Sequence, residues 1–590
     1  MEPLSVDHEQ ESRDGGFELS LCPVLGQVIR LDRNRIEVEL SGPGPAAQVT
    51  VSDLVAFPTA NGILVGLLES VARQSSARSN DAHAQESAPA PVLLRVMPVG
   101  TIRVAEGGSV FTRGAAAYPH VGARCHLIDG EHLQAFMAIL AEDVEPHERL
   151  VLGSYVRSSE ASAVADGNRL FQRHLAFVGS TGAGKSWAVA LMLERAAQLR
   201  HANLIVFDLH GEYAPLTRPV SGREPVARLL RVAGPADLDR PSDDLLYLPY
   251  WLLQRDELMT LVLNHDDPHA ADQIFRFTEH VQTLKKISLA DSHREDALAT
   301  FTVDSPVPYK LDSLIRALRQ DDSERIPQHP SNRMEPGPYF RRLTGFVSRL
   351  EARLADPRYG FIFNPPAETC SYDWLTETAI SLLEAGPAAR GIKVVDLSEV
   401  PSAIVPLVVG VLARLIYNIQ FWMEPSRRTP VCLVCEEAHV YLPERDAGNG
   451  VHRAALDAFE AIAKEGRKHA VTLLVVSQRP TDVSRTILSQ CNNFIVMRLT
   501  NDHDRTMVER LLPETVASVV GTLPALEPGE AIVVGDALLL PTRIKFDSPA
   551  HVPASGTRPY WSLWAEQPSS AEAIRAGVEA LQKQVRPRSS

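Results

Sequence analysis

Residues Gly179–Ser186 read Gly-Ser-Thr-Gly-Ala-Gly-Lys-Ser, and this spacing of glycines, lysine and hydroxyl is typical of a loop that binds phosphate. Glycines let successive backbone N–H groups point inward toward phosphate oxygens, and a helix predicted to begin near the last glycine adds the positive end of its dipole. The lysine could reach β- and γ-phosphates, and the serine hydroxyl could ligate Mg²⁺. We therefore predict a nucleotide site made by Gly179, Ser180, Thr181, Gly182, Ala183, Gly184, Lys185 and Ser186.

Acidic residues follow two further apolar runs. Leu204–Asp208 is a predicted strand that ends in a carboxylate, and Val431–Cys435 runs directly into Glu436 and Glu437. A strand followed by two acids is the Walker B arrangement, in which the first acid holds Mg²⁺ through water and the second orients or deprotonates the attacking water. Asp208 could reach the ion or a water from its strand end, although a capping role is the alternative.

A polar residue also follows the apolar run Val471–Val476. Gln478 lies two residues beyond this predicted strand, in the sequence Ser-Gln-Arg-Pro. Because the carboxyl ends of parallel strands meet at one edge of a sheet, the amide of Gln478 could sense a γ-phosphate there.

The regions before this core have a different pattern. Short strands separated by turn residues fill residues 21–150 and favour a small β-barrel, for which we predict a docking or assembly role. Residues 1–20 are acidic and polar and are expected to be disordered.

The remaining sequence alternates between α/β and helical patterns, and at 590 residues it is too long for one hydrophobic core. Strand, loop and helix occur in residues 151–226 and return in 391–548, which predicts one α/β core in two parts. Helical periodicity in residues 227–390 predicts a helical insertion between those parts. Residues 549–590 are expected to form a C-terminal arm outside the core.

Composition limits the class of protein. A net charge of −14 argues against a surface that coats nucleic acid, but it leaves room for a local basic channel. Cys432 and Cys435 stand in an apolar strand pattern without a second metal-spaced pair, so burial is favoured over zinc binding. Ala403–Met423 is long and apolar but interrupted by polar residues, which favours a buried helix over a membrane span. With no signal-peptide pattern at Met1, we expect a cytoplasmic protein.

Five motifs together resemble the HerA family of the FtsK–HerA group of ATPases. The resemblance covers about residues 20–550, and it implies a RecA-like P-loop core and a HAS-barrel at the N-terminus. The motifs are His-x-x-x-x-Gly-x-Thr-Gly-x-Gly-Lys-Ser from His174, Phe-Asp-x-His-Gly-Glu-Tyr from Phe207, Glu-Glu-Ala-His from Glu436, Glu-Gly-Arg-Lys from Glu465 and Ser-Gln-Arg-Pro from Ser477.

The resemblance also implies roles for matching positions. Glu436 corresponds to the Walker B acid and Glu437 to the catalytic glutamate. Arg467 matches an arginine finger that reaches the ATP of a neighbouring subunit, Arg173 matches a second nucleotide-site arginine, and Gln478 matches a sensor.

In that family the chains form homohexameric rings that use ATP and Mg²⁺ to pump double-stranded DNA. They work with a partner nuclease or effector (NurA-like, sirtuin-like or another defence nuclease) in DNA-end processing or antiviral defence. The partner is expected on the barrel, and the loop Tyr441–Arg453, with Arg445 and Arg453, is the predicted DNA contact. Two alternatives stay open: a secretion or conjugation ATPase, and a nucleotide-gated scaffold for an effector nuclease.

Overall fold

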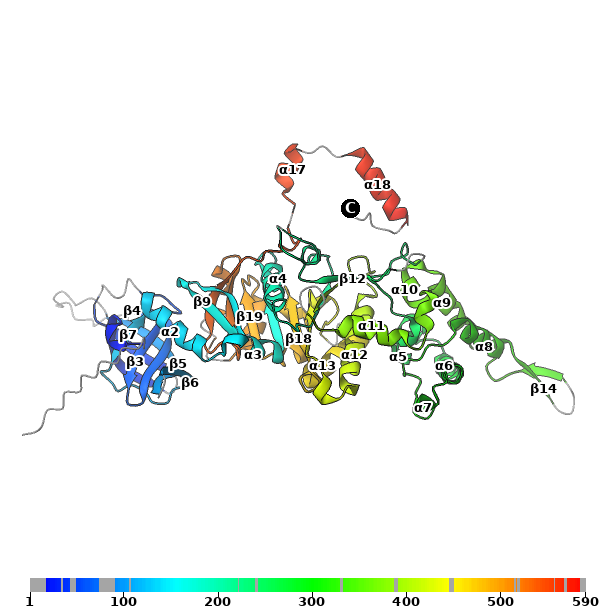
Figure 1. Cartoon of the computed structure of the whole chain (residues 1–590), viewed down its shortest axis with the longest axis horizontal. Coiled ribbons are helices and arrows are strands. Elements are labelled where there is room, and N and C mark those ends of the chain that lie inside the picture. Colours follow the sequence, from blue (N-terminus) through cyan, green and yellow to red (C-terminus); the bar gives the residue numbers. More distant parts are fainter. Residues whose placement is uncertain are drawn as a thin grey trace, which may run out of the picture. The chain divides into compact units, whose positions relative to one another are not determined.

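The computed structural model describes residues 17–32, 35–42, 49–73, 91–105, 108–220, 222–238, 242–328, 333–386, 391–444, 450–513, 516, 520–556, 558–566 and 570–583. The chain forms two compact units (Figure 1). The first unit comprises Met1–Leu170, Gly179–Gly184 and Asn493–Asp547, and the second comprises Phe171–Val178, Lys185–Asn492 and Ser548–Ser590. Residues 1–16 of the tail predicted to be disordered lie outside the described residues.

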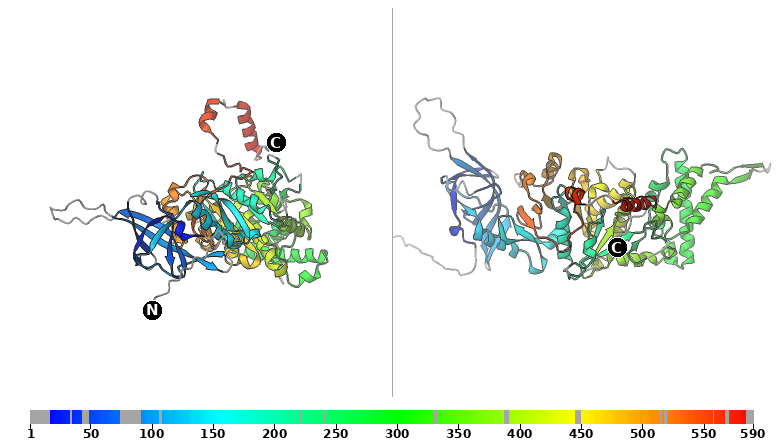
Figure 2. Two further views of the ribbon diagram at one scale, coloured as in Figure 1. Left: turned by 60° about the vertical axis from the view of Figure 1, so that its left-hand side comes forward. Right: turned by 90° about the horizontal axis from the view of Figure 1, so that it is seen from above.

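Six strands of the first unit close into an antiparallel barrel, drawn in blue in Figure 2. They pair in the order β2–β1–β7–β3–β4–β5, and β2 pairs with β5 to complete the ring. A seventh strand, β6, pairs with the far end of the long strand β5. The strands are β1 (Val24–Asp32), β2 (Arg35–Leu40), β3 (Leu54–Thr59), β4 (Gly62–Arg73), β5 (Val92–Ala105), β6 (Gly108–Arg113) and β7 (Arg124–Ile128).

The barrel interior is filled by side chains that alternate inward along the strands, as the period of two in a β-strand requires. Its core includes Leu25, Val28, Ile36, Val38, Val55, Phe57, Leu64, Leu68, Leu94, Val96, Cys125 and Leu127. Helix α2 (Gly130–Glu142) follows β7 and buries Phe136 against Phe111, with ring centroids 5.5 Å apart in an edge-on arrangement. The interior is therefore a packed core.

The rest of the first unit is an antiparallel sheet in the order β19–β20–β21–β8–β9. Its elements are β8 (Arg149–Tyr155), β9 (Ser158–Asp166), β19 (Asn493–Met497), β20 (Glu530–Gly535) and β21 (Thr542–Phe546), with the helices α3 (Gly167–Gln172) and α15 (Asp502–Leu511).

Arg113, at the end of β6, fastens the barrel to this sheet. Its guanidinium donates hydrogen bonds to the backbone carbonyls of Gly535, Leu538 and Leu539 and pairs with Asp536. One arginine thus satisfies several carbonyls of the turn between β20 and β21, and a buried or half-buried carbonyl left without a donor would be costly.

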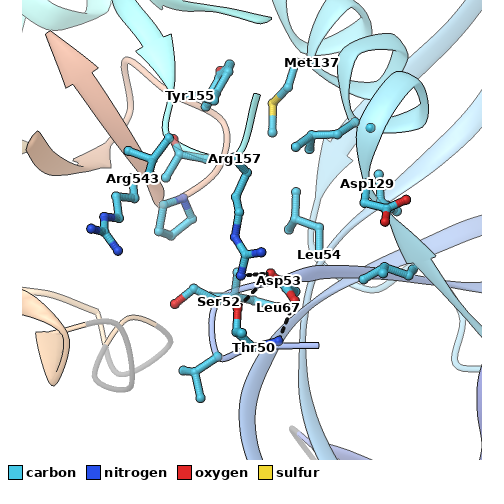
Figure 3. Close-up of a pocket in the computed structure, with 18 of the residues that line it drawn as sticks. Thr50, Ser52, Asp53, Leu54, Leu67, Asp129, Met137, Tyr155, Arg157 and Arg543 are labelled. Atoms are coloured by element: carbon cyan, nitrogen blue, oxygen red, sulfur yellow. Dashed lines mark hydrogen bonds and ion pairs between the residues drawn. The ribbon is translucent and has the colours of Figure 1, made fainter. Parts of the chain in front are cut away.

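A pocket of about 400 Å³ opens beside this junction (Figure 3). Apolar side chains from the barrel and α2, such as Leu54 and Met137, make most of its wall. The guanidinium of Arg157 points across the pocket to the buried carboxylate of Asp53, which also accepts a hydrogen bond from the backbone of Thr50. The hydroxyl of Ser52, which also lines the pocket, is buried and has no hydrogen-bond partner among the described residues.

The second unit is built on a parallel sheet in the order β13–β12–β16–β11–β17–β18–β10. The strand that precedes the phosphate loop, β10, is separated from the strand that ends in Glu436, β17, by β18 alone. The strands are β10 (Leu175–Val178), β11 (Leu204–Asp208), β12 (Arg228–Val232), β13 (Leu245–Leu246), β16 (Ile392–Asp396), β17 (Val431–Cys435) and β18 (Val471–Ser477).

Helices α4 (Lys185–Ala196), α12 (Val405–Trp422) and α13 (Gly450–Glu465) belong to this sheet. α12 and α13 approach closely at Gly410, because a Cβ there would lie 2.7 Å from the Cα of Ala455. Among the described helices, α12 alone is long and apolar enough to cross a membrane, and 67% of that stretch is buried in the fold. Arg414, which interrupts the apolar sequence of α12, donates two hydrogen bonds of 2.7 Å to the carboxylate of Glu257.

The helical insertion contains α5 (Arg255–Val262), α6 (Ala270–Asp291), α7 (Glu295–Leu298), α8 (Leu311–Ser323), α9 (Thr344–Ala355), α10 (Gly360–Phe363) and α11 (Trp374–Leu383), with the hairpin β14 (Arg325–Gln328) and β15 (Arg333–Pro336). The range 227–390 that was predicted as helical also includes β12 and β13. These two strands extend the parallel sheet beyond β16, so the sheet continues into the first part of that range.

The C-terminal segment crosses the second unit before two helices, α17 (Tyr560–Glu566) and α18 (Ala571–Lys583). The carboxylate of Glu194, on α4, accepts hydrogen bonds from the backbone N–H of Ala550 and His551 and from the His551 ring. Ala554 donates its N–H to the carbonyl of Glu212 at 2.8 Å. The segment is therefore bonded to the helix and loop that surround the predicted nucleotide site.

The predicted architecture is confirmed: a closed antiparallel barrel precedes an α/β core, and helices are inserted in that core.

Candidate nucleotide site

The phosphate loop connects β10 to α4, and its backbone explains its glycines. Gly182 and Gly184 have φ angles of +74° and +103°, in the left-handed region that glycine adopts without strain. A Cβ on Gly179 would lie 2.8 Å from the Cβ of Met497. The loop is held at its end, because the N–H of Gly529 donates to the carbonyl of Ala183 at 2.9 Å. The structure thus gives this sequence the strand–loop–helix geometry of a phosphate cradle.

Lys185 is the first residue of α4, and Ser186 follows it on the same helix. The lysine is buried, and burial lowers the pKa of its ammonium group, while the nearby carboxylates of Glu437, Glu436 and Glu212 raise it. These carboxylates follow β17 and β11, two strands that pair directly. The lysine predicted to bind phosphate therefore lies among three acidic groups at the carboxyl edge of the sheet.

Glu436 is the most deeply buried of these acids, with 3% of its surface exposed. Its Oε2 has no hydrogen-bond partner among the described residues. Burial, together with the charges of Glu437 and Glu212, raises the pKa of Glu436 to about 8, against the lowering effect of Lys185. An unpaired buried carboxylate oxygen is costly unless a cation joins it.

This donor set suits Mg²⁺ bound together with a nucleotide. The ion takes oxygen ligands and usually keeps waters, using one or two carboxylates plus substrate phosphates. Glu436 and the hydroxyl of Ser186 are the groups that would hold it. No group of three or more His, Cys, Asp or Glu arranged to bind a metal by themselves occurs in the part of the chain that the structure describes. Cys432 and Cys435 are buried in β17, and burial raises the pKa of both thiols.

Glu437 is held in a strained backbone conformation. Its φ and ψ are +46° and +45°, which is left-handed and uncommon for a residue other than glycine. Its carboxylate is 13% exposed and lies 3.3 Å from Nδ1 of His439. Strain of this kind costs about 1–3 kcal/mol and persists only where neighbouring structure enforces it. The turn after β17 therefore fixes the direction of the Cα–Cβ bond from which this carboxylate extends.

Asp208, predicted at the strand end either to reach the ion or a water or to cap its loop, is bonded to the loop that follows β11. Its Oδ1 accepts the backbone N–H groups of His210, Gly211 and Glu212 at 2.9–3.2 Å, and its Oδ2 accepts that of Tyr213 at 2.9 Å. Burial raises the pKa of Asp208 to about 6, against the lowering effect of these donors. A carboxylate engaged by four N–H groups shapes the loop after β11, as the capping alternative proposed.

Glu212 is the site residue that sequence reasoning missed. It belongs to the His-Gly-Glu-Tyr segment after β11, and its charge acts on both Lys185 and Glu436. The next residue, Tyr213, is fully buried, and burial together with the charge of Glu436 raises the pKa of its phenol. The motif that begins at Phe207 contained the signal, but nothing in the sequence showed that its glutamate would face the lysine.

Gln478 follows β18 directly and is half-buried. β18 pairs with both β10 and β17, so the end of β18 lies between the end of the phosphate-loop strand and the end of the Glu436 strand. The predicted sensor thus stands at the same edge of the sheet as the acids.

Arg467 lies elsewhere, in a 3₁₀ turn (Gly466–His469) between α13 and the start of β18. Its side chain is exposed, and its guanidinium forms no hydrogen bond or ion pair with any residue that the structure describes, including the neighbouring Glu465. Behind it the buried ring of His174 bonds to the carbonyl of Ala463 and to the N–H of Leu473, at 3.1 Å and 3.0 Å. The preceding residue, Arg173, is half-buried, and its carbonyl accepts the N–H of Asn492.

Comparison with known proteins agrees with this core. Residues 150–416 match the family model described as the central domain of helicase HerA. The chain is 24% identical over 456 residues to a DNA double-strand break repair helicase HerA of Pyrococcus furiosus, covering 72% of this chain and 74% of that protein. It is 26% identical over 379 residues to the protein of that name in Sulfolobus acidocaldarius, and the match covers 64% of this chain and 65% of that protein.

Among solved structures, VirB4 of Thermoanaerobacter pseudethanolicus matches at 16% identity and a TM-score of 0.42, covering 71% of this chain and 99% of that one. The bacterial conjugative coupling protein TrwB lacking its first 70 residues matches at 12% identity and a TM-score of 0.42, covering 70% and 92%.

Proposed function

We propose that this chain, which belongs to the HerA family of helicases, uses the energy of ATP hydrolysis to move double-stranded DNA. Hydrolysis of ATP itself follows from the family and from the P-loop core. The observation that supports the proposal most directly is the meeting of Lys185 with Glu436, Glu437 and Glu212 at one edge of the sheet.

In the proposed reaction Lys185 binds the β- and γ-phosphates, and the loop amides bind the remaining phosphate oxygens. Glu437 orients the attacking water and accepts its proton, and the left-handed turn after β17 sets the direction in which its side chain leaves the backbone. Glu436 stays buried beside the lysine and keeps a free oxygen for a cation. When bound, Mg²⁺ would neutralise charge that develops on the phosphate oxygens.

Two substitutions test these roles. Lys185→Ala should weaken ATP binding, whereas Glu437→Gln should leave binding intact and slow hydrolysis by about 10²–10⁴-fold. Glu572→Gln, on the exposed face of α18, is the matched control and should behave as wild type. The assignment of Glu437 is wrong if its glutamine variant hydrolyses ATP at the wild-type rate.

Movement along DNA is tested by stimulation of the ATPase. A motor that follows the phosphate backbone should bind without sequence preference, and its affinity should fall steeply with salt. In the loop proposed to contact DNA, Arg445 lies outside the described residues, while Arg453 is exposed on α13. A nucleotide-gated scaffold or a secretion ATPase would show no stimulation by double-stranded DNA at any salt concentration.

A homohexameric ring is part of the proposal, supported by the exposed guanidinium of Arg467, which no described residue engages. An arginine in this state can complete the nucleotide site of a neighbouring subunit. Sedimentation with and without ATP would show whether the ring forms, and a species that stays monomeric under both conditions would contradict it.

A partner nuclease or other effector is proposed to dock on the barrel, whose described residues hold no group of three or more His, Cys, Asp or Glu that could bind a metal ion. Purified protein should therefore hydrolyse ATP without cutting DNA. Arg103 is exposed on β5 and suits a charge-reversal test of docking, but Arg113 does not, because its loss would release the turn between β20 and β21. If effector binding survives changes across the barrel but is lost when the arm from Pro549 onward is removed, the effector docks on the arm and not on the barrel.

A further inference from the structure

His439 lies between the proposed water-activating carboxylate and the end of β18. Its Nδ1 is 3.3 Å from Oε2 of Glu437 and 3.3 Å from Oγ of Ser477. The histidine ring is mostly buried, with 18% of its side chain exposed, and Ser477 is completely buried. One ring nitrogen therefore contacts two groups that come from different strands, β17 and β18.

The Ser477 hydroxyl is itself fixed in position. Its Oγ accepts the backbone N–H of Arg479 at 3.0 Å, across the residue that we propose as the γ-phosphate sensor, Gln478. Any change in the backbone at Gln478 therefore moves the oxygen that His439 contacts.

Glu437 has little freedom of its own, because its left-handed backbone fixes the direction of its Cα–Cβ bond. What remains adjustable is the rotation of its side chain, and His439 is the group placed to set it. The Oε2 atom of Glu437 is buried without a hydrogen bond, although it lies within 3.3 Å of the ring nitrogen. The carboxylate is therefore near the ring but not fully engaged by it.

We infer that His439 is a positioning residue that orients Glu437 for water activation and couples it, through Ser477, to the strand end that carries Gln478. This inference rests on the proposed role of Glu437 in hydrolysis. In it, Nδ1 is shared between the hydroxyl and the carboxylate. A shift of the strand end changes that sharing, and the carboxylate rotates toward or away from the water.

The charges around the ring are compatible with such sharing. Burial lowers the pKa of His439, the carboxylates of Glu437 and Asp482 raise it, and Arg479 and Lys185 lower it. A neutral imidazole carries a single N–H and can exchange one hydrogen-bond partner for another, whereas a charged ring would bind the carboxylate more tightly.

The test compares kcat with ATP affinity. His439→Ala should lower kcat by about 10–100-fold, as expected when a reacting group is misplaced by about 1 Å, and should leave the affinity for a fluorescent ATP analogue unchanged. His439→Asn retains an amide nitrogen near the position of Nδ1 and should recover part of the lost rate. Ser477→Ala, a small change in the core, should also lower kcat, as His439→Ala does. His265→Ala, at an exposed position in the insertion, is the matched control.

A double-mutant cycle separates coupling from general damage. Once Glu437→Gln has removed the carboxylate, adding His439→Ala should lower the residual rate no further. An equal fold-loss in both backgrounds would overturn the inference, as would full activity of His439→Ala. Either result leaves the proposed function standing as long as Glu437→Gln alone is inactive, whereas an active Glu437→Gln enzyme would refute the role of Glu437 itself.

Discussion

Replacing Glu436 with glutamine should stabilise the nucleotide-free protein at alkaline pH. Burial raises the pKa of Glu436 from the ordinary glutamate value of 4.5 to about 8, so the folded protein holds a proton that the unfolded chain releases. Folding is therefore favoured by this group below pH 4.5, and the free energy of unfolding falls as the pH rises toward 8. Glutamine has no proton to lose, and its contribution does not change over this range.

The size of the effect follows from the shift in pKa. One pKa unit corresponds to about 1.36 kcal/mol, so relative to low pH this shift lowers the free energy of unfolding by about 1 kcal/mol at pH 5 and by about 4 kcal/mol at pH 8. Water that enters the site would screen the charge, which makes about 4 kcal/mol an upper limit. The desolvation cost of the glutamine amide is the same at both pH values, so it cancels from the difference of about 3 kcal/mol between them.

The assay is unfolding by urea, followed by tryptophan fluorescence in EDTA without nucleotide. Trp251 is fully buried in the second unit and packs on Trp374, so it reports on that unit. Relative to wild type, Glu436→Gln should gain stability at pH 8 and little at pH 5, while Glu572→Gln should follow wild type at both. Addition of ATP and Mg²⁺ should reduce the difference in the free energy of unfolding between Glu436→Gln and wild type at pH 8. Parallel pH dependence of the variant and wild type would refute the burial argument.

Three further predictions concern other parts of the chain. Mixing Arg467→Ala with Lys185→Ala subunits should restore some ATPase activity, because some subunit interfaces then hold an intact site. An arginine finger that acts across subunits is worth about 10³–10⁵ in rate. No recovery of activity in confirmed mixed rings would argue against action in trans. Arg453→Ala should lower DNA-stimulated ATPase more than basal ATPase, and an equal fall in both would indicate misfolding. His551→Ala should lower the melting temperature, because a hydrogen bond to the charged carboxylate of Glu194 is worth about 1.5–3 kcal/mol, and an unchanged melting temperature would contradict that contribution.

The phosphate loop and the strand ending in Glu436 could be recognised from sequence because each is a local pattern. An apolar run, a turn with left-handed glycines and a helix start are set by neighbouring residues, and the structure has them where they were expected. The barrel strands could be anticipated for the same reason, since alternation and turn residues act over short distances.

Roles that depend on long-range pairing could not be assigned in this way. An acid at the end of a strand looks alike in sequence whether it keeps an oxygen without a partner among the described residues, like Glu436, or binds its own loop, like Asp208. Glu212 became a site residue only because β11 pairs with β17, strands separated by the insertion. Arg113 is a similar case, since its partners lie more than 400 residues further along the chain.

Strand β20 gives the first unit a mechanical connection between its two ends. At one end the carbonyl of Gly535 is bound by Arg113 of the barrel, and just before the other end the N–H of Gly529 is bonded to Ala183 of the phosphate loop. Six strand residues span roughly 20 Å and resist stretching, because their backbone is already extended. The strand is thus a tie, and tension applied at Arg113 passes along it to the hydrogen bond between Gly529 and the phosphate loop.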